Sequence, residues 1–327
     1  MSITELYSNH YGVAPTQCEL LSAAGSNRRY YRLTDGEGQT VIGVEGTSAH
    51  ENHVFITMAR HFATKHLNTP KVIVASDDEM CYLQEDLGNS SLYDTIKKHV
   101  GHWEQDADEA ISLLRTSLTL LPRFQVEAND GMDYSVCHPI NEMNYRSIMW
   151  DLNYFKYCFI KLAGIEFDEN ALEDDFESLT VQLINRRREM KFMYRDFQSR
   201  NIMLTPTGPM FIDFQGGRRG PLLYDVVSFL WQARLQLPEH IKMSLFEDYL
   251  TALECRLPET DTNTLRADLQ YWVLFRTLQV LGAYGFRGYH ERKQQFLDSI
   301  EPAISSLLSQ SLLYNYKEIY KCISILN

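Results

Sequence analysis

Tyr194-Arg-Asp-Phe-Gln-Ser-Arg-Asn201 is followed, after a short turn, by the segment Met210-Phe-Ile-Asp-Phe214. Asn201 opens a short apolar run, and Asp213 closes the run that returns beyond Thr205-Pro-Thr-Gly-Pro209. Proline and glycine between two short apolar runs are typical of a hairpin turn. The pattern therefore predicts two short paired strands that bring Asn201 and Asp213 close together.

Three oxygen-bearing side chains in this unit match what phosphoryl transfer requires. The reaction needs a group that accepts the hydroxyl proton, ligands for magnesium, and in-line positioning of two substrates. Asp196 precedes Asn201 by five positions, the spacing of the D-x-x-x-x-N loop, and is the predicted base. Asn201 and Asp213 are the predicted ligands of Mg²⁺, which takes a few protein oxygens in addition to substrate phosphates. A single aspartate before a strand is usually a turn residue, so the prediction rests on the three together.

The chain as a whole has the composition of an ordinary globular protein. With 327 residues it is long enough for two lobes, and no apolar run reaches the ~18 residues of a membrane span. Residues 1–20 carry acids where a signal peptide needs a basic start and an apolar centre. Six cysteines stand singly, without a CxxC pair or a histidine partner at metal-ligand spacing. We expect a cytoplasmic protein with reduced thiols and no membrane partner.

The formal net charge of −12 leaves no basic field for a phosphate backbone, so nucleic acid is not an expected partner. A cationic or neutral small substrate is easier to accommodate at this net charge. An acidic balance is also common among bacterial cytosolic enzymes, and this simpler explanation carries more weight.

The pattern of apolar residues changes character after Gly88. Before it, short β-branched or aromatic runs predict four or five strands, and a helix is predicted from about His50 to Leu67. The runs are Arg29 to Leu33, Thr40 to Glu45, Lys71 to Ala75 and Met80 to Glu85. After it, helical spacing is found in Asp108 to Leu121, Asn141 to Leu162, Leu172 to Met190 and four segments after Leu222. The sequence predicts an α+β fold with a β-rich lobe, residues 1–87, and a larger helical lobe, residues 88–327.

The block from Tyr194 to Leu230 resembles the aminoglycoside phosphotransferase and choline kinase superfamily. In that family the loop reads His-Gly-Asp more often than Tyr-Arg-Asp, so Arg195 stands where a glycine is usual. Together with Gly25-Ser-Asn-Arg-Arg-Tyr-Tyr-Arg-Leu33 and Arg276-Thr-Leu-Gln-Val-Leu-Gly-Ala-Tyr-Gly285, it resembles the N-acetylmuramate and N-acetylglucosamine anomeric kinases of cell-wall recycling. The similarity runs from about Leu20 to Leu308. It implies a bilobal protein-kinase-like fold and an enzyme that uses ATP and Mg²⁺.

The resemblance also implies where the nucleotide binds. Glu85-Asp-Leu87 would be the hinge between the lobes, with backbone groups of Glu85 and Leu87 meeting adenine, unless the segment is a simple linker. The loop over the phosphates would consist of Gly25, Ser26, Asn27, Arg28 and Arg29, although a plain hairpin turn would look the same.

One expected nucleotide contact is missing from the sequence. The segment Thr40 to Glu45 contains no lysine for the α- and β-phosphates. Arg28 or Arg29 is the candidate for that charge, and the helical residue Glu51 then has no lysine to orient.

The acceptor is expected against the helical lobe. Residues 144–155 are the predicted wall, in which Trp150, Tyr154 and Phe155 either stack on a sugar ring or, with greater weight, pack in the core. Asp151 is a candidate polar contact to sugar hydroxyls, but it could equally form a surface ion pair.

Two further polar residues have an expected role with an alternative. Arg200 lies in sequence between the predicted base and metal ligand, where it would contact the acceptor or form an ion pair. Asp225 would either cap the helix that follows Gly220-Pro221 or brace the catalytic loop by hydrogen bonds.

The expected function is ATP- and Mg²⁺-dependent phosphorylation of a hydroxyl, with the anomeric hydroxyl of an N-acetylated amino sugar implied by the resemblance. An aminoglycoside or choline/ethanolamine-type phosphotransferase is the alternative among enzymes, and the acidic net charge fits it. The absent strand lysine suggests a nucleotide-binding regulatory pseudokinase, but the intact Asp196, Asn201 and Asp213 argue against one. A protein kinase is disfavoured because no Ala-Pro-Glu segment follows Asp213. We expect a monomer or homodimer whose partners are ATP and a small-molecule acceptor.

Overall fold

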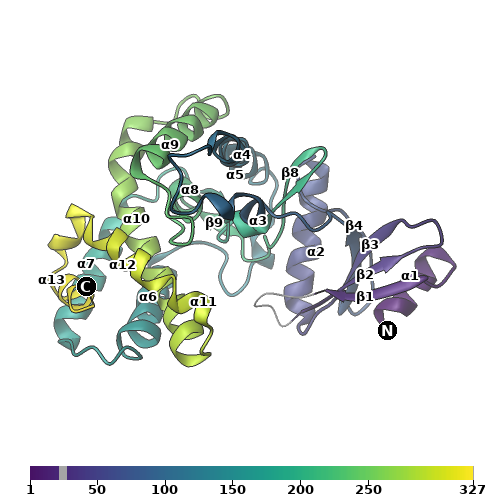
Figure 1. The fold of residues 1–327 in the computed structure, drawn as a ribbon, viewed down its shortest axis with the longest axis horizontal. Helices are drawn as coiled ribbons and strands as arrows, with labels where there is room; N and C mark the ends of the chain where they lie inside the picture. The colour runs from purple at the N-terminus through teal and green to yellow at the C-terminus, as the bar shows by residue number, and fades with distance from the viewer. Residues whose placement is uncertain (22–27, 327) are drawn as a thin grey trace.

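The computed structural model describes residues 1–21 and 28–326 and has two lobes (Figure 1). The first lobe contains a five-stranded antiparallel sheet with strand order β1-β2-β3-β5-β4. The strands are β1 (Gln17–Leu21), β2 (Arg29–Thr34), β3 (Thr40–Glu45), β4 (Val72–Ala75) and β5 (Cys81–Glu85). Four of them coincide with the predicted runs, and β1 is an additional edge strand.

A helix covers each face of this sheet. Helix α1 (Ile3–Tyr11), which the sequence analysis did not predict, begins with a capping box between Ser2 and Glu5. It packs so closely that a Cβ on Gly43 of β3 would lie 2.3 Å from an Ile3 side-chain carbon. The predicted helix is α2 (Ala49–Thr64), and it lies between the sheet and the second lobe (Figure 1).

Helix α2 joins the two lobes into one hydrophobic core. The Phe55 ring stacks on Tyr82 of β5 and on Phe214 of the second lobe, with centroid separations of 5.0 and 4.7 Å. Phe62 makes edge-to-face contacts with Phe124 and Phe214, an arrangement that aromatic rings favour. The relative placement of the lobes is therefore set by packed rings.

The second lobe is mostly α-helical, as predicted. Its first helices are α3 (Leu92–Ile96), α4 (Asp108–Thr119), α5 (Leu121–Glu127), α6 (Tyr145–Phe155) and α7 (Glu169–Asn185). They are followed by α8 (Leu222–Leu230), α9 (Glu239–Glu254), α10 (Thr262–Gly285), α11 (Gln294–Leu297), α12 (Ile300–Leu308) and α13 (Lys317–Ser324). The long α10 packs against α6, α8 and α12. None of the helices in the described part of the chain is long and apolar enough to cross a membrane.

Some predicted helix boundaries are wrong, and local capping explains them. Helix α6 starts at Tyr145 because Asn144 and Ser147 form a capping box, and it continues as one π-helical turn, Lys156–Ile160. Helix α7 starts earlier than predicted because the Asp168 side chain accepts from the Ala171 N–H. Within residues 222–326 there are six α-helices and not four, since short helices such as α11 and α13 give little periodic signal.

Four short strands lie in or beside the segment from Tyr194 to Phe214. Strand β6 (Lys191–Met193) pairs with β9 (Arg218–Gly220), and β7 (Ile202–Thr205) forms the predicted hairpin with β8 (Gly208–Phe211). Asn201 ends a 3-10 turn, Ser199–Asn201, rather than opening the strand. Strand β8 ends before Asp213, whose φ of +67° is incompatible with extended backbone.

Candidate active site

Asp225 holds the loop that carries Asp196. Its buried carboxylate accepts hydrogen bonds from the backbone N–H groups of Tyr194 at 2.6 Å and Arg195 at 2.8 Å. Burial raises the pKa of Asp225 to about 7, although the two backbone hydrogen bonds oppose the rise. The N-cap residue of α8 is Pro221, so no side chain caps the start of this helix. Of the two roles considered for Asp225, the geometry is that of a brace.

Arg195 occupies a backbone conformation that normally favours glycine. Its φ is +78°, and its guanidinium donates from Nη1 and Nη2 to the two carboxylate oxygens of Asp151, at 2.9 and 2.8 Å. Such bidentate pairs are strong and geometrically specific. The ion pair fixes the side chain while Asp225 fixes the backbone, so the loop accepts an arginine where the resemblance leads one to expect glycine.

The same contact bears on the role of Asp151. This residue is buried at 8% exposure, so the ion pair it forms is an internal one and not the surface pair considered from sequence. It links α6 to the loop that carries Asp196. A direct contact between Asp151 and an acceptor stays a prediction.

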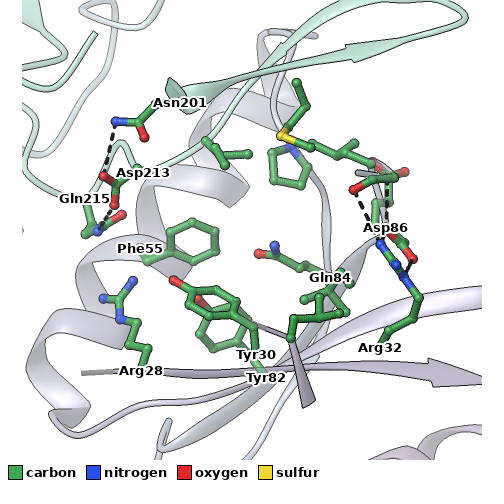
Figure 2. A pocket seen from close by; sticks show the side chains of 18 of the residues that line it. Arg28, Tyr30, Arg32, Phe55, Tyr82, Gln84, Asp86, Asn201, Asp213 and Gln215 are labelled. Atoms are coloured by element: carbon green, nitrogen blue, oxygen red, sulfur yellow. Dashed lines mark hydrogen bonds and ion pairs between the residues drawn. The ribbon is translucent and has the colours of Figure 1, made fainter. Parts of the chain in front are cut away.

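Asn201 and Asp213 lie side by side after their two strands fold back. Asn201 Nδ2 donates to Asp213 Oδ2 at 3.2 Å and to the Asp196 carbonyl at 2.9 Å. Gln215 Nε2 donates to Asp213 Oδ1 at 2.8 Å (Figure 2). Burial, followed by the negative charge of Asp196, raises the pKa of Asp213. A cation placed beside these acids would favour their charged forms.

The donor atoms at this point suit magnesium. An amide oxygen and a carboxylate are hard ligands, and Mg²⁺ usually takes one or two protein carboxylates and completes its coordination with phosphates and water. The described residues contain no cluster of three or more His, Cys, Asp or Glu side chains that would form a closed metal cage. Asn201 and Asp213 therefore fit a metal that is shared with a phosphate ligand.

A cavity of about 830 Å³ lies between the lobes (Figure 2). Asn201 and Asp213 line one end of it. The predicted hinge residues Glu85 and Leu87 line the cavity as well. Asp86, between them in the sequence, forms an ion pair with Arg32, and the Nε–Oδ2 distance is 2.5 Å. The cavity thus brings together the residues predicted for a nucleotide and for its metal.

Arg28 supplies a positive charge to this cavity. It is buried, and its Nη2 lies 3.6 Å from Oε2 of Glu51 on α2. Glu51 has no strand lysine to orient, as expected, but Arg28 reaches it from just before β2. Of the other predicted phosphate-loop residues, Arg29 opens β2 and is exposed.

Three residues predicted for the same loop, Gly25, Ser26 and Asn27, lie outside the described residues. Their role in binding phosphate stays a prediction.

A second cavity, of about 130 Å³, is lined in part by Asp196. Three guanidinium groups line it, those of Arg200, Arg234 and Arg276. Arg200 also lines the large cavity, so the two cavities meet at this side chain. Asp196 is the only carboxylate among the described residues that line the second cavity. A ligand there would meet a positive surface next to one acid.

Neutral groups hold two of these arginines in place. Nε and Nη2 of Arg276 donate to Ser228 Oγ at 3.2 and 3.0 Å, and Arg234 Nη2 donates to the Gln295 carbonyl at 2.7 Å. Neither Arg234 nor Arg276 had a predicted role. For Arg276, the available signal was an arginine within the apolar pattern of α10, because charged residues are rarely buried without a partner.

Residues 144–155, the predicted acceptor wall, do not line this cavity, and their contact with an acceptor stays a prediction. Phe155 is fully buried and stacks on Phe159 at 5.7 Å, whereas Trp150 is exposed. Helix α6 packs against α10 at Gly282, where a Cβ would lie 2.9 Å from the Phe155 nitrogen. The wall near Asp196 comes from α8, the segment that follows it, and α10, with residues 227–234 and 276–284.

Residues 17–262 match the phosphotransferase enzyme family. The chain belongs to this family. Proteins named N-acetylmuramate/N-acetylglucosamine kinase are similar along most of its length. The one from Neisseria meningitidis is 24% identical over 298 residues, which cover 88% of this chain and 83% of the relative. The one from Pseudomonas aeruginosa is 24% identical over 294 residues, covering 88% and 82%.

Solved structures of other kinases share the fold. An ethanolamine kinase from Plasmodium vivax superposes with a TM-score of 0.64 at 11% identity, covering 89% of this chain and 82% of that one. Amicoumacin kinase hAmiN gives 0.62 at 14% identity, with 91% of each chain covered. The bilobal fold and the resemblance expected from sequence are confirmed. The present chain is a small-molecule kinase with a hydroxyl acceptor.

Proposed function

We propose that the chain transfers the γ-phosphate of ATP to the anomeric hydroxyl of an N-acetylated amino sugar. The observation that carries the proposal is the position of Asp196, which lines a small cationic cavity next to the Asn201–Asp213 pair in the large cavity. The names of the relatives support an amino-sugar acceptor. The anomeric position is implied by the resemblance of the loop that contains Arg195.

The reaction divides between the two cavities. The acceptor occupies the small one, and its hydroxyl oxygen attacks the γ-phosphorus of ATP in the large one. The bond from that phosphorus to the bridging oxygen breaks, ADP leaves, and Asp196 takes the hydroxyl proton. Magnesium, held by Asn201 and Asp213, would neutralise charge on the phosphates. Arg28 offers a second positive charge, oriented by Glu51.

The charge of the small cavity favours an acidic amino sugar such as N-acetylmuramate. Arg200, Arg234 and Arg276 can pair with a carboxylate, and guanidinium–carboxylate hydrogen bonds are among the strong ones. A cationic aminoglycoside or choline would place like charges together in the same space. The net charge of −12 suggested such acceptors, but it is spread over the whole chain, whereas the acceptor responds to the local charge.

The regulatory pseudokinase has no structural observation in its favour. The absent strand lysine suggested a pseudokinase, but Arg28 can take the place of that lysine. Asp196, Asn201 and Asp213 adjoin one another. The test is an ADP-release assay with Mg-ATP and a panel of acceptors: N-acetylmuramate, N-acetylglucosamine, simple hexoses, choline and kanamycin. Transfer to an amino sugar supports the proposal. ADP release with choline or kanamycin alone, or with no acceptor of the panel, contradicts it.

A further inference from the structure

The small cavity that Asp196 lines falls below the usual size of a ligand site. Its volume is about 130 Å³, whereas sites that bury a small-molecule ligand usually measure ~300–1,000 Å³. The large cavity holds the nucleotide in the proposed function. An acceptor in the small cavity therefore needs additional space on the side away from the nucleotide.

A third cavity, of about 410 Å³, adjoins the small one. Trp231, Gln232 and Val280 line both cavities. The other walls of the third cavity come from the segment that follows α8 and from α9, α10 and α12, all in the second lobe (Figure 1). Gln232 Oε1 accepts a hydrogen bond from Ser199 Oγ at 2.8 Å. The boundary between the two cavities is thus attached to the loop that carries Asp196.

The lining of the third cavity suits an uncharged sugar ring. Trp231 offers an indole, whose apolar faces can pack against the C–H groups of a sugar. Lys242 and Glu301 bring one positive and one negative charge, so the charges on the described lining residues balance. Amide and hydroxyl side chains, which both donate and accept hydrogen bonds, are supplied by Gln236, Ser305 and Ser306. This chemistry differs from that of the small cavity, where arginines dominate.

Gln236 lines the third cavity in a backbone conformation that favours glycine. Its φ is +46°, a region in which a Cβ makes the backbone costly to hold. Residues held in such sparsely populated conformations are found preferentially at ligand and active sites. The chain therefore keeps an amide side chain on this cavity at a position where glycine would relieve the backbone.

The proposed acceptor chemistry decides which extension fits. The reaction uses the anomeric hydroxyl of N-acetylmuramate at Asp196, while its carboxylate pairs with Arg200 or Arg234. A peptide attached through that carboxylate would turn it into an amide and remove the charge. A second sugar, attached through another ring hydroxyl, leaves the anomeric hydroxyl and the carboxylate free.

We propose that the third cavity binds a second, uncharged sugar ring, so that the preferred acceptor is a disaccharide with the N-acetylated amino sugar at its reducing end. The proposal rests on the proposed function for the placement of the first ring. The bonds formed and broken in the transfer stay the same.

Binding of three sugars in the presence of Mg-ADP tests the proposal without any transfer. Calorimetry measures the dissociation constants of N-acetylmuramate, of N-acetylmuramate that carries N-acetylglucosamine on a ring hydroxyl, and of N-acetylmuramate that carries a dipeptide on its carboxylate. The native chain should bind the disaccharide about 10- to 100-fold more tightly than N-acetylmuramate, the value of a few added hydrogen bonds. It should bind the dipeptide compound more weakly than N-acetylmuramate.

Ser306→Trp fills the third cavity from α12. Ser306 lines this cavity and not the small one, so the variant should lose the advantage of the disaccharide and keep the native dissociation constant for N-acetylmuramate. Ser309→Trp is the matched control, because Ser309 is exposed at the end of α12 and outside the lining. It should bind both sugars as the native chain does, and thermal unfolding checks that the variants are folded.

Gln236→Gly provides a second test that does not endanger folding, because glycine accepts positive φ. Loss of the amide should weaken disaccharide binding by about 2- to 10-fold, the value of one hydrogen bond, and leave the binding of N-acetylmuramate unchanged.

Three outcomes overturn the proposal: equal binding of the disaccharide and N-acetylmuramate by the native chain, an advantage that both variants leave intact, or tightest binding of the dipeptide compound. Transfer to N-acetylmuramate with no advantage for the disaccharide would leave the proposed function standing alone. Tighter disaccharide binding through the third cavity, without transfer to either sugar, would contradict the proposed function and leave the second sugar site standing.

Discussion

Arg195 and Asp151 form a bidentate ion pair that ties the loop containing Asp196 to α6, with Nη1–Oδ2 and Nη2–Oδ1 separations of 2.9 and 2.8 Å. The side chains are only 17% and 11% exposed, so each charge depends on the other. Because Arg195 also has positive φ, the loop next to Asp196 combines a strained backbone position with a partner that secures it.

Separating this pair should destabilise the protein. Asp151→Ala leaves a buried guanidinium unpaired, and Arg195→Gly leaves a buried carboxylate, each at a cost of about 3–5 kcal/mol in the free energy of unfolding. The double variant leaves neither charge and places glycine at φ +78°, which glycine tolerates. Urea unfolding of all four proteins measures this, and the double variant should lose less free energy of unfolding than the two single variants lose together. Strictly additive losses would contradict this account.

Asp196→Ala should reduce turnover by about 10²–10⁴, the usual contribution of a positioned general base. Steady-state ADP release with saturating acceptor measures the effect, while the affinity for nucleotide should change little because Asp196 does not line the large cavity. Asp77→Ala removes an exposed loop aspartate and is the control. Unchanged turnover in Asp196→Ala would remove this residue from the mechanism.

Asp225 should make stability depend on pH in a defined direction. An unfolded aspartate titrates near pH ~4, whereas burial raises the pKa of Asp225 to about 7. The folded protein therefore holds the proton between these values, and the contribution of Asp225 to the free energy of unfolding falls as pH rises from ~4 to about 7. The contribution of Asp225 is fully present below pH ~4 and no longer changes with pH above about 7.

Asp225→Asn does not titrate, so the difference in unfolding free energy between native and variant proteins should decline across this pH range. Denaturant titrations between pH 5 and 8 measure it, with Asp77→Asn as a control that shows no such slope. A difference that is independent of pH would mean that Asp225 has an ordinary pKa. The variant should also lose turnover, because its amide cannot accept from the backbone N–H groups of Tyr194 and Arg195 through both atoms.

The cationic cavity should distinguish acidic from neutral acceptors. Arg200→Gln and Arg234→Gln should each lower kcat/KM for N-acetylmuramate by about 10- to 100-fold, the value of a hydrogen bond to a charged group. The loss for N-acetylglucosamine should be smaller, since it has no carboxylate to pair. Arg146→Gln, at an exposed position of α6, is the control. Equal losses for the two sugars would show that these arginines do not read a carboxylate.

Local signals in the sequence predicted much of this structure. The spacing of Asp196, Asn201 and Asp213 placed them together because the motif is short and closed by a hairpin. The strands of the first lobe followed from runs of β-branched and aromatic residues. Helix α1 was missed because residues 1–20 were considered only as a possible signal peptide, although Ser2 and Glu5 have the spacing of a capping box.

The contacts that complete the site join residues far apart in sequence. Arg28 reaches Glu51, Arg195 reaches Asp151, and Arg200 meets Arg276 at one cavity only after the helices pack. No periodicity or spacing encodes such a meeting, so the positive charge of the small cavity could not be predicted from the net charge of the chain. The roles of Asp151 and Asp225 were open for the same reason.

Phosphate transfer to an amino sugar tests the central claim most directly. The native chain is incubated with Mg-ATP and N-acetylmuramate, ADP release is followed, and the product is identified by phosphorus NMR, with Asp213→Ala as the control. We predict a sugar phosphate formed at the anomeric position by the native chain and almost none by the variant. No transfer to N-acetylmuramate or N-acetylglucosamine, or undiminished transfer by Asp213→Ala, would contradict the account.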